Sequence, residues 1–246
     1  MRKDSKNIDL LFERGKRLVE SQKLNDALAV FNKILQYDPK NAEAYYYCGL
    51  VNRFLARMEE AITDFDQAIR LKSDYPLVYY VRANLKVSME KYEEAIADYD
   101  QAIRYHLPID RVYYDRGIAK YGAGRYPEAI TDFGKSIQQQ QKMDEAYYWR
   151  GCSYLHLGRY EAALKDFDAS IRLDPMDQRV SQMRGFVNIL LDRHHAAIKD
   201  FDSVLGLIPE NIIVVLGREI AMRSLQRDLK NRYTEKKNGG GDEESK

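Results

Sequence analysis

The sequence predicts an all-α solenoid of six helix–turn–helix repeats followed by a capping helix. Small and aromatic residues recur at 34-residue steps, each period contains two amphipathic patterns separated by a turn, and an apolar segment with a basic end follows the last period. One helical pair has an apolar face that it cannot bury within itself, so neighbouring copies must cover it. Each repeat then contacts mainly the repeats beside it.

The stretch from Asp144 to Pro175 shows the pattern of one repeat most clearly. Its first half places Tyr147, Gly151 and Tyr154 at intervals of four and three residues, which puts them on one face of a helix. Gly158 interrupts the pattern, and a second amphipathic helix runs from there to the closing proline. We therefore expect two helices joined by a turn at Gly158.

Three residue positions carry the 34-residue period. Steps from Gly151 lead to small residues: Gly15, Gly49, Ala83, Gly117 and Gly185. Steps from Ala163 lead only to alanines: Ala27, Ala61, Ala95, Ala129 and Ala197. Steps from Phe167 lead to aromatic residues: Phe31, Phe65, Tyr99, Phe133 and Phe201. A glycine inside a helix costs up to about 1 kcal/mol relative to alanine, so its recurrence indicates that two helix backbones approach each other closely.

The repeats follow one another without an insertion. They are predicted to span residues 8–41, 42–75, 76–109, 110–143, 144–177 and 178–211. Residues 1–7 are polar and are expected to form a flexible N-terminus. Residues 212–233 begin apolar and end basic, as suits a capping helix. Residues 234–246 contain three glycines and no apolar residue, which predicts a disordered tail.

This pattern resembles the tetratricopeptide repeat (TPR) family, in which an aromatic, Leu-Gly and Tyr precede Ala, Phe and Pro at the same period. The resemblance covers residues 8–211 and implies a right-handed superhelical solenoid whose first helices line a concave face. The usual Trp is replaced by Tyr in the inner repeats, at Tyr45, Tyr79, Tyr113 and Tyr147. The Leu that usually precedes the Gly is mostly Arg.

The composition of the chain limits the kinds of partner and location that we expect. The 246 residues include 39 basic and 38 acidic side chains, a balance that disfavours nucleic acid as the main partner. Cys48 and Cys152 lie three repeats apart, so we expect no disulfide between them. Neither an apolar signal-peptide core nor an apolar run long enough to cross a membrane is present. We therefore expect a cytoplasmic protein without a membrane span.

Two charged positions also repeat. An aspartate precedes the aromatic residue in five repeats: Asp64, Asp98, Asp132, Asp166 and Asp200. An arginine precedes the Gly position in most first helices and in the cap: Arg14, Arg82, Arg116, Arg150, Arg184 and Arg218. Pairing each Asp with the Arg of its own repeat leaves Val30 and Cys48 as two mismatches, whereas pairing it with the Arg of the following repeat sets these two apolar residues against each other. We therefore predict ion pairs in the second register, which bridge consecutive repeats: Asp64–Arg82, Asp98–Arg116, Asp132–Arg150, Asp166–Arg184 and Asp200–Arg218.

The first helices also carry a column of aromatic residues, which we call the aromatic ladder: Phe12, Tyr46, Tyr80, Tyr114 and Tyr148. Together with neighbouring positions it predicts an aromatic-lined concave groove that binds an extended peptide, since exposed apolar surface rich in Tyr and Trp is typical of partner sites. The predicted groove consists of Phe12, Tyr46, Tyr47, Leu50, Tyr80, Asn84, Tyr114, Ile118, Tyr148, Trp149, Cys152 and Phe186.

Two interpretations of the ladder remain open. Its rings could pack each first helix onto the next, as aromatic stripes often do. Alternatively, a partner peptide could lie along them, since helices pack about 8–10 Å apart and a polyproline-type strand advances about 9.3 Å per turn. Some members of the resembled family grip chaperone tails with a carboxylate clamp, but the corresponding positions hold mainly Phe12, Lys16, Tyr47, Leu77 and Val81. Only Lys16 is basic, which disfavours a clamp to heat-shock chaperones.

Chemical motifs are sparse. The sequence contains no phosphate-binding loop, no paired-cysteine zinc spacing and no nucleophile motif. His194 and His195 fall at a turn and lack further ligands at metal-binding spacing, so we expect a solvated turn and no metal or cofactor. The sequence therefore predicts a non-catalytic protein-interaction scaffold or adaptor. The alternatives are a self-associating structural module, hence a homo-oligomer, and an accessory subunit of a larger complex.

Overall fold

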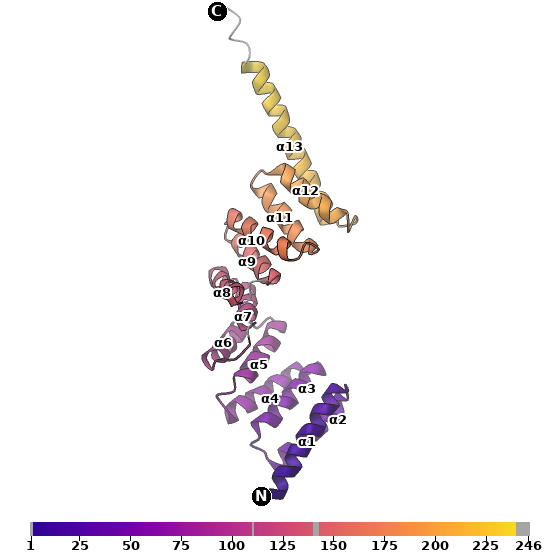
Figure 1. The fold of residues 1–246 in the computed structure, drawn as a ribbon, viewed down its shortest axis with the longest axis vertical. Helices are drawn as coiled ribbons and strands as arrows, with labels where there is room; N and C mark the ends of the chain where they lie inside the picture. The colour runs from indigo at the N-terminus through magenta and orange to yellow at the C-terminus, as the bar shows by residue number, and fades with distance from the viewer. Residues whose placement is uncertain (1, 110, 140–142, 240–246) are drawn as a thin grey trace, which may run out of the picture. The chain divides into compact units, whose positions relative to one another are not determined.

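The computed structural model describes residues 2–109, 111–139 and 143–239, with side chains from residue 7 to 234 of these ranges. Within these ranges the chain forms thirteen helices and no strand, so the fold is an all-α repeat solenoid (Figure 1). It divides into two compact units, Met1–Arg125 and Tyr126–Lys246, which we call the N-terminal and C-terminal units.

The N-terminal unit holds the first seven helices. Its helices are α1 (Arg2–Glu20), α2 (Leu24–Tyr37), α3 (Ala42–Phe54), α4 (Met58–Leu71), α5 (Pro76–Ser88), α6 (Tyr92–Arg104) and α7 (Val112–Gly122). The closest packing is within the pairs α1/α2, α3/α4 and α5/α6, and the second helix of each pair also contacts the helix that follows it.

The C-terminal unit continues the same alternation. Its helices are α8 (Tyr126–Gln139), α9 (Asp144–His156), α10 (Tyr160–Leu173), α11 (Gln178–Leu190), α12 (His194–Leu205) and α13 (Ile212–Gly239). The pairs α9/α10 and α11/α12 pack most closely, and α13 packs on α12. Here too, α8, α10 and α12 each contact the helix that follows them, and α10 and α12 also pack on the first helix of their own pair.

Both end helices are longer than the sequence suggested. Helix α1 begins at Arg2, where we expected a flexible lead-in, and α13 continues to Gly239, into the expected tail. Lys, Arg and Glu have favourable helix propensities, and adding residues to an existing helix avoids the cost of nucleation. The rest of the expected tail, residues 240–246, lies outside the described residues.

The glycine and aromatic positions meet inside helix pairs of both units. A methyl group placed on Gly15 would lie 2.5 Å from the ring of Phe31, and one on Gly151 would lie 2.7 Å from the ring of Phe167. The aromatic residues of this position are almost completely buried. The recurring glycine is therefore required because a ring, rather than a second backbone, occupies the space of its missing side chain.

The turn inside each helix pair has one residue with a positive φ. Gly124 and Gly158 hold this position with φ of 74° and 69°. At the equivalent position, other pairs use side-chain residues with φ between 56° and 59°: Gln22, Ala56, Glu90 and Asp192. The next residue closes the helix by donating a backbone hydrogen bond to a carbonyl in the last helical turn, as Arg57 does to the carbonyl of Asn52 at 2.9 Å.

The predicted register of the ion pairs is wrong. Arg82 donates hydrogen bonds to both carboxylate oxygens of Asp98, at 2.9 and 2.5 Å, and Arg184 binds Asp200 in the same way. The Asp therefore pairs with the Arg of its own helix pair rather than with that of the next one. These aspartates are buried between the two helices of the pair, so they face away from the next pair.

A different aspartate bridges consecutive helix pairs. Arg116 donates to Asp100 at 2.6 Å, Arg184 donates to Asp168 at 2.6 Å, and Arg218 binds Asp202 at the equivalent position. This second Asp follows the buried one by two positions, about 200° further round the helix, and so points toward the following helix. The arginine side chain consequently connects three helices.

Candidate functional site

The aromatic ladder packs mainly inside the helix pairs. Its rings lie close to the buried aromatic residue of the second helix: Phe12 is 6.1 Å from Phe31, and Tyr80 is 6.0 Å from Tyr99, between ring centroids. Phe12, Tyr46 and Tyr114 are buried, whereas Tyr80 and Tyr148 are half-buried. The structural interpretation of the ladder therefore accounts for much of its ring surface.

The predicted groove residues divide by exposure. Four are buried and can offer little to a partner: Phe12, Tyr46, Tyr114 and Cys152. Eight are half-buried: Tyr47, Leu50, Tyr80, Asn84, Ile118, Tyr148, Trp149 and Phe186. Sequence periodicity could not separate these groups, because both lie on one side of the first helices.

In the N-terminal unit, cations lie over several of these rings. Lys16 Nζ is 5.9 Å from the ring centre of Phe12 and 5.5 Å from that of Tyr47. The Arg111 guanidinium is 4.5 Å from the ring of Tyr114. Cations at these distances are attracted to the ring faces. We call the half-buried surface around them the first-helix face: Lys16, Tyr47, Leu50, Tyr80, Asn84 and Ile118.

Hydrogen bonds fix the polar groups of this face. The Tyr80 hydroxyl donates to Asp115 at 2.6 Å, and Tyr99 donates to Asn84 at 2.5 Å. Burial, together with the neighbouring Asp115 carboxylate, raises the pKa of Tyr80 to about 12. The phenol therefore stays protonated at neutral pH and holds α5 against α7. Neither this bond nor the stacking of Arg111 was apparent from the sequence.

The C-terminal unit has a smaller surface of the same kind. Trp149 packs edge-on to Tyr148, with ring centres 5.2 Å apart, and Arg179 lies 5.3 Å from the Tyr148 ring. Arg179 is held by a hydrogen bond of 2.7 Å to Asp177. Phe186 packs edge-on against Phe201, with centres 5.2 Å apart. Arg179 is a further residue of this surface that the repeat pattern does not reveal.

Both cysteines are free and buried. Burial raises the pKa of each thiol to about 12, so neither is a thiolate at neutral pH. Cys48 occupies the place that Arg takes in other helix pairs, and its Sγ lies 3.7 Å from Oδ1 of Asn32. The environment of these thiols is that of small core side chains rather than of nucleophiles.

His194 is not solvated, contrary to the sequence-based expectation. It is 5% exposed, and its Nε2 lies 3.2 Å from Oδ2 of Asp228 on α13. A pocket of about 340 Å³ lies beside it, between the start of α12 and α13. The length of α13 explains the burial, since its later turns cover the histidine. Within the described part of the chain, no three His, Cys, Asp or Glu side chains are grouped so that they could hold a metal.

The helix pairs, their period and the Gly–aromatic contact define an α-solenoid repeat protein. Models of the tetratricopeptide repeat match residues 80–144 and 114–178, 42–75 and, under the description TPR repeat, 15–52. The chain therefore belongs to the tetratricopeptide repeat family, whose fold serves as a scaffold for protein–protein interaction.

Curated relatives match over short stretches. The human mitochondrial import receptor subunit TOM70 is 34% identical over 67 residues, which are 27% of this chain and 11% of TOM70. The Arabidopsis thaliana protein SPINDLY, a probable UDP-N-acetylglucosamine–peptide N-acetylglucosaminyltransferase, is 31% identical over 75 residues, 30% of this chain and 8% of SPINDLY. The chain thus matches about a tenth of each relative, and the match to SPINDLY does not show catalysis here.

Solved structures share the fold at low identity. YrrB, described as a TPR protein with an unusual peptide-binding site, superposes with a TM-score of 0.69 at 20% identity, covering 77% of this chain and 97% of YrrB. Pseudomonas aeruginosa PilF superposes at 0.68 with 15% identity, covering 86% of this chain and 96% of PilF. No helix in the described ranges has both the length and the apolar character of a membrane span.

Proposed function

We propose that this protein is a non-catalytic scaffold that binds an extended peptide segment of a partner protein along the first-helix face of its N-terminal unit. The observation that carries the proposal is the combination of half-buried Tyr47, Leu50 and Ile118 with the cation Lys16 over the aromatic rings. Tyr side chains and apolar contacts beside fixed charges are typical of partner sites. The peptide-binding site named for YrrB, which has the same fold, is consistent with it.

The burial of the ladder changes how a partner would be bound. Tyr46 and Tyr114 are buried among the helices, so a partner would contact mainly the half-buried side chains of the first-helix face. A segment with a carboxylate beside its apolar residues would share Lys16 with Glu13, 3.5 Å away, and Arg111 with Asp115, 3.3 Å away. Because the ladder rings pack against the second helices, removing them should lower the stability of the protein, and a loss of binding would then not isolate a contact with the partner.

The test uses a display library of random linear peptides selected against the full chain, followed by affinity measurements on the selected peptides. Leu50→Glu and Ile118→Glu should each weaken binding at least tenfold, because they place a carboxylate on a half-buried apolar surface. The matched control is Thr63→Glu, at an exposed position of α4, which should leave affinity unchanged. A library that yields no binder, or binders indifferent to Leu50 and Ile118, would overturn the proposal.

Self-association is the second candidate, and one observation favours it. The first turns of α13 expose an apolar row in which Ile212, Ile213, Leu216 and Ile220 are 53–72% exposed. Rows of this kind often mark interfaces. Light scattering after size-exclusion chromatography separates the two candidates: a concentration-dependent dimer that Ile220→Asp dissolves supports self-association, and a monomer at high micromolar concentration excludes it.

A further inference from the structure

Leu10 in α1 is exposed at a position that every later first helix buries. Its side chain is 69% exposed. The residues at 34-residue steps from it are all 0–4% exposed: Ala44, Val78, Val112, Ala146, Val180 and Val214. In each compact unit the preceding second helix covers this position, as α2 covers Ala44 with Phe31 and Ile34. Leu10 thus shows an apolar face for which the described residues supply no covering helix.

Arg14 lies one turn further along the same face. Arg82, Arg116, Arg184 and Arg218 occupy its position in other helices, and each binds an Asp on the second helix that precedes it. The residue that would pair with Arg14 inside its own helix pair is Val30, which is apolar and buried. Within the described residues no carboxylate lies in ion-pair range of Arg14, so its guanidinium remains available to a group from outside.

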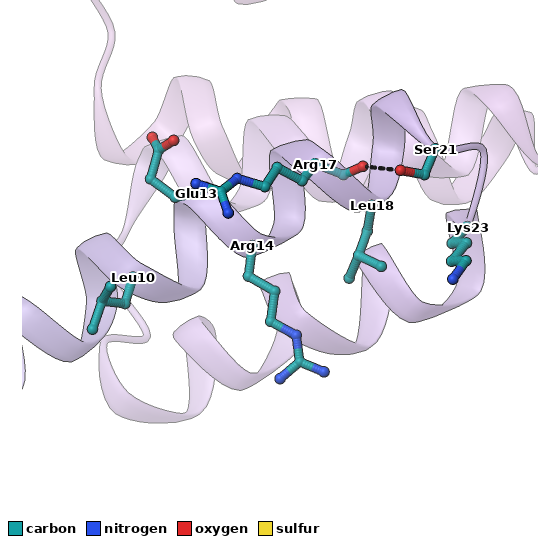
Figure 2. A pocket seen from close by; sticks show the side chains of 7 residues that line it. All are labelled: Leu10, Glu13, Arg14, Arg17, Leu18, Ser21 and Lys23. Atoms are coloured by element: carbon teal, nitrogen blue, oxygen red, sulfur yellow. Dashed lines mark hydrogen bonds between the residues drawn. The ribbon is translucent and has the colours of Figure 1, made fainter.

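Two pockets adjoin Arg14, and the charged side chains that line them are mostly basic. One pocket of about 240 Å³ is lined by Leu10, Arg14, Arg17 and Lys23, and Figure 2 shows Arg14 and Leu18 extending from the same side of α1. The other, of about 310 Å³, lies toward α2 and adds Lys33 and Tyr37. Glu13, the acidic side chain lining the first pocket, is 3.5 Å from Lys16. We call this surface the N-terminal edge: Leu10, Arg14, Arg17, Lys23, Lys33 and Tyr37.

We propose that the N-terminal edge is a second docking site, which receives an acidic amphipathic α-helix of a partner protein. The helix caps the solenoid in the way that a second helix covers the next first helix. Small apolar side chains of the helix bury Leu10, and an aspartate on its next turn binds Arg14. The basic side chains around them attract the remaining acidic residues. This site is separate from the first-helix face and does not depend on the function proposed above.

A second copy of the chain fits the edge less well. Two N-terminal edges facing each other would oppose basic side chains. The later turns of α13 are also basic, with Arg223, Arg227, Lys230 and Arg232 against Asp228. Like charges in apposition cost free energy at an interface, so the occupant that complements this edge carries the opposite charge.

The chain itself supplies the probe. A peptide with the sequence of residues 58–71, MEEAITDFDQAIRL, reproduces α4, which covers Val78 and binds Arg82 through Asp66. The segment has four acidic side chains and one basic, and three acidic side chains remain when a crosslink replaces that of Glu59. The peptide is labelled, held helical by a crosslink between the exposed positions 59 and 63, and titrated into the full-length protein while fluorescence anisotropy is measured.

Saturable binding should weaken at least tenfold for Leu10→Asp and for Arg14→Glu. A peptide carrying Asp66→Arg should bind the Arg14→Glu protein better than the unchanged peptide does, because the charges are exchanged. Ile220→Asp on α13 is the matched control and should leave affinity unchanged. Circular dichroism checks folding, which the substitutions should preserve because Leu10 and Arg14 are exposed.

Several results would overturn the proposal. One is the absence of saturable binding at millimolar peptide. A second is equal binding of a scrambled peptide with the same charge, which would reduce the edge to non-specific electrostatics. A third is a dimer at micromolar protein that Leu10→Asp dissolves, which would make a second copy the occupant.

Discussion

Arg150 holds the carboxylate of Asp166 with two parallel hydrogen bonds, each of 2.7 Å, from Nε and Nη2. The same guanidinium lies 5.5 Å from the ring centre of Tyr147, one turn earlier in α9. The hydrogen bonds to Asp166 raise the pKa of Arg150 above its ordinary value. The arginine, the tyrosine and the buried carboxylate thus form a clamp between α9 and α10.

The bridge from this clamp to the preceding helix is missing its acidic partner. Asp100, Asp168 and Asp202 supply the carboxylate elsewhere, but the corresponding residue before Arg150 is Gly134 in α8. A β-carbon built on Gly134 would lie 3.8 Å from Nη1 of Arg150, an ordinary contact that leaves room for a side chain.

Gly134→Asp should therefore stabilise the protein by completing the bridge. Replacing a mid-helix glycine improves helix propensity, and a partly exposed ion pair adds about 0.5 kcal/mol. Gly134→Asn is the control, since it changes propensity without adding charge. The melting temperature of the Asp variant should exceed that of the Asn variant by about 1–2 °C. Equal melting temperatures at low salt would show that no bridge forms.

Asp64 occupies the same position in α4 as Asp166 does in α10. The arginine that would pair with Asp64 inside its helix pair is replaced by Cys48. It accepts a hydrogen bond of 2.8 Å from Asn52 Nδ2 in place of a guanidinium. Burial raises the pKa of Asp64 to about 6, and the nearby Glu60 adds to the rise while the Asn52 bond opposes it. The folded protein therefore binds this proton more tightly than the unfolded chain does.

The raised pKa of Asp64 predicts that this residue stabilises the folded protein at acidic pH. Because the folded pKa lies above the unfolded value, the contribution is fully present below about pH 4 and is lost as the pH rises through 6. Asp64→Asn, which imitates the protonated form, should be more stable than the wild type at pH 7 by about 1 kcal/mol after allowance for solvent screening. The difference should vanish near pH 4, as measured by urea unfolding.

The same substitution at Asp166 should have the opposite sign. Asp166→Asn removes the charge that the half-buried Arg150 requires, and the loss of one partner from a buried pair costs about 3–5 kcal/mol. Unfolding at pH 7 should therefore occur at much lower urea than in the wild type. If both variants changed stability in the same direction, the replacement of Arg by Cys48 would not be what distinguishes Asp64.

The repeat architecture was predictable because its determinants are local and periodic. Gly151 and Phe167 recur at fixed spacing, since one ring must fill the space above one glycine in each helix pair. The ion-pair register was not predictable from matching alone. Both registers join two helices, and the choice between them depends on which way the buried Asp faces. The mismatch at Cys48, which favoured the wrong register, marks a real local exception.

The candidate site was only partly predictable for a related reason. A residue column on a first helix can face solvent or the second helix of its pair, and periodicity is the same in both cases. One signal was present in the sequence. Ladder residues precede the buried aromatic residue of their helix pair by a constant spacing, as Tyr80 precedes Tyr99, and these two rings are in contact. Leu10, by contrast, is exposed because no helix of the described residues covers this position of α1. Its exposure could be recognised only in the structure.

The left-handed turn residues give a further prediction from a matched pair of sites. Ala56 and Gly158 occupy the same turn position, with φ of 59° and 69°, and each turn is closed by a backbone hydrogen bond of 2.9 Å from the next residue. A side chain at positive φ is strained by its β-carbon, whereas glycine is not. Ala56→Gly should therefore raise the free energy of unfolding by about 0.5–1 kcal/mol, despite the added freedom of the unfolded chain.

Gly158→Ala is the reciprocal change and should lower the free energy of unfolding by about 1 kcal/mol. Apart from Gly158 itself and its two chain neighbours, no residue places an atom within 4 Å of a β-carbon built on Gly158, so a loss there would come from the backbone angle rather than from a clash. Urea unfolding of both variants, with the slope against urea held constant, measures the two effects. Stabilisation by Ala56→Gly together with destabilisation by Gly158→Ala is the expected pair of results, and a gain in both would contradict the assignment of strain to these turns.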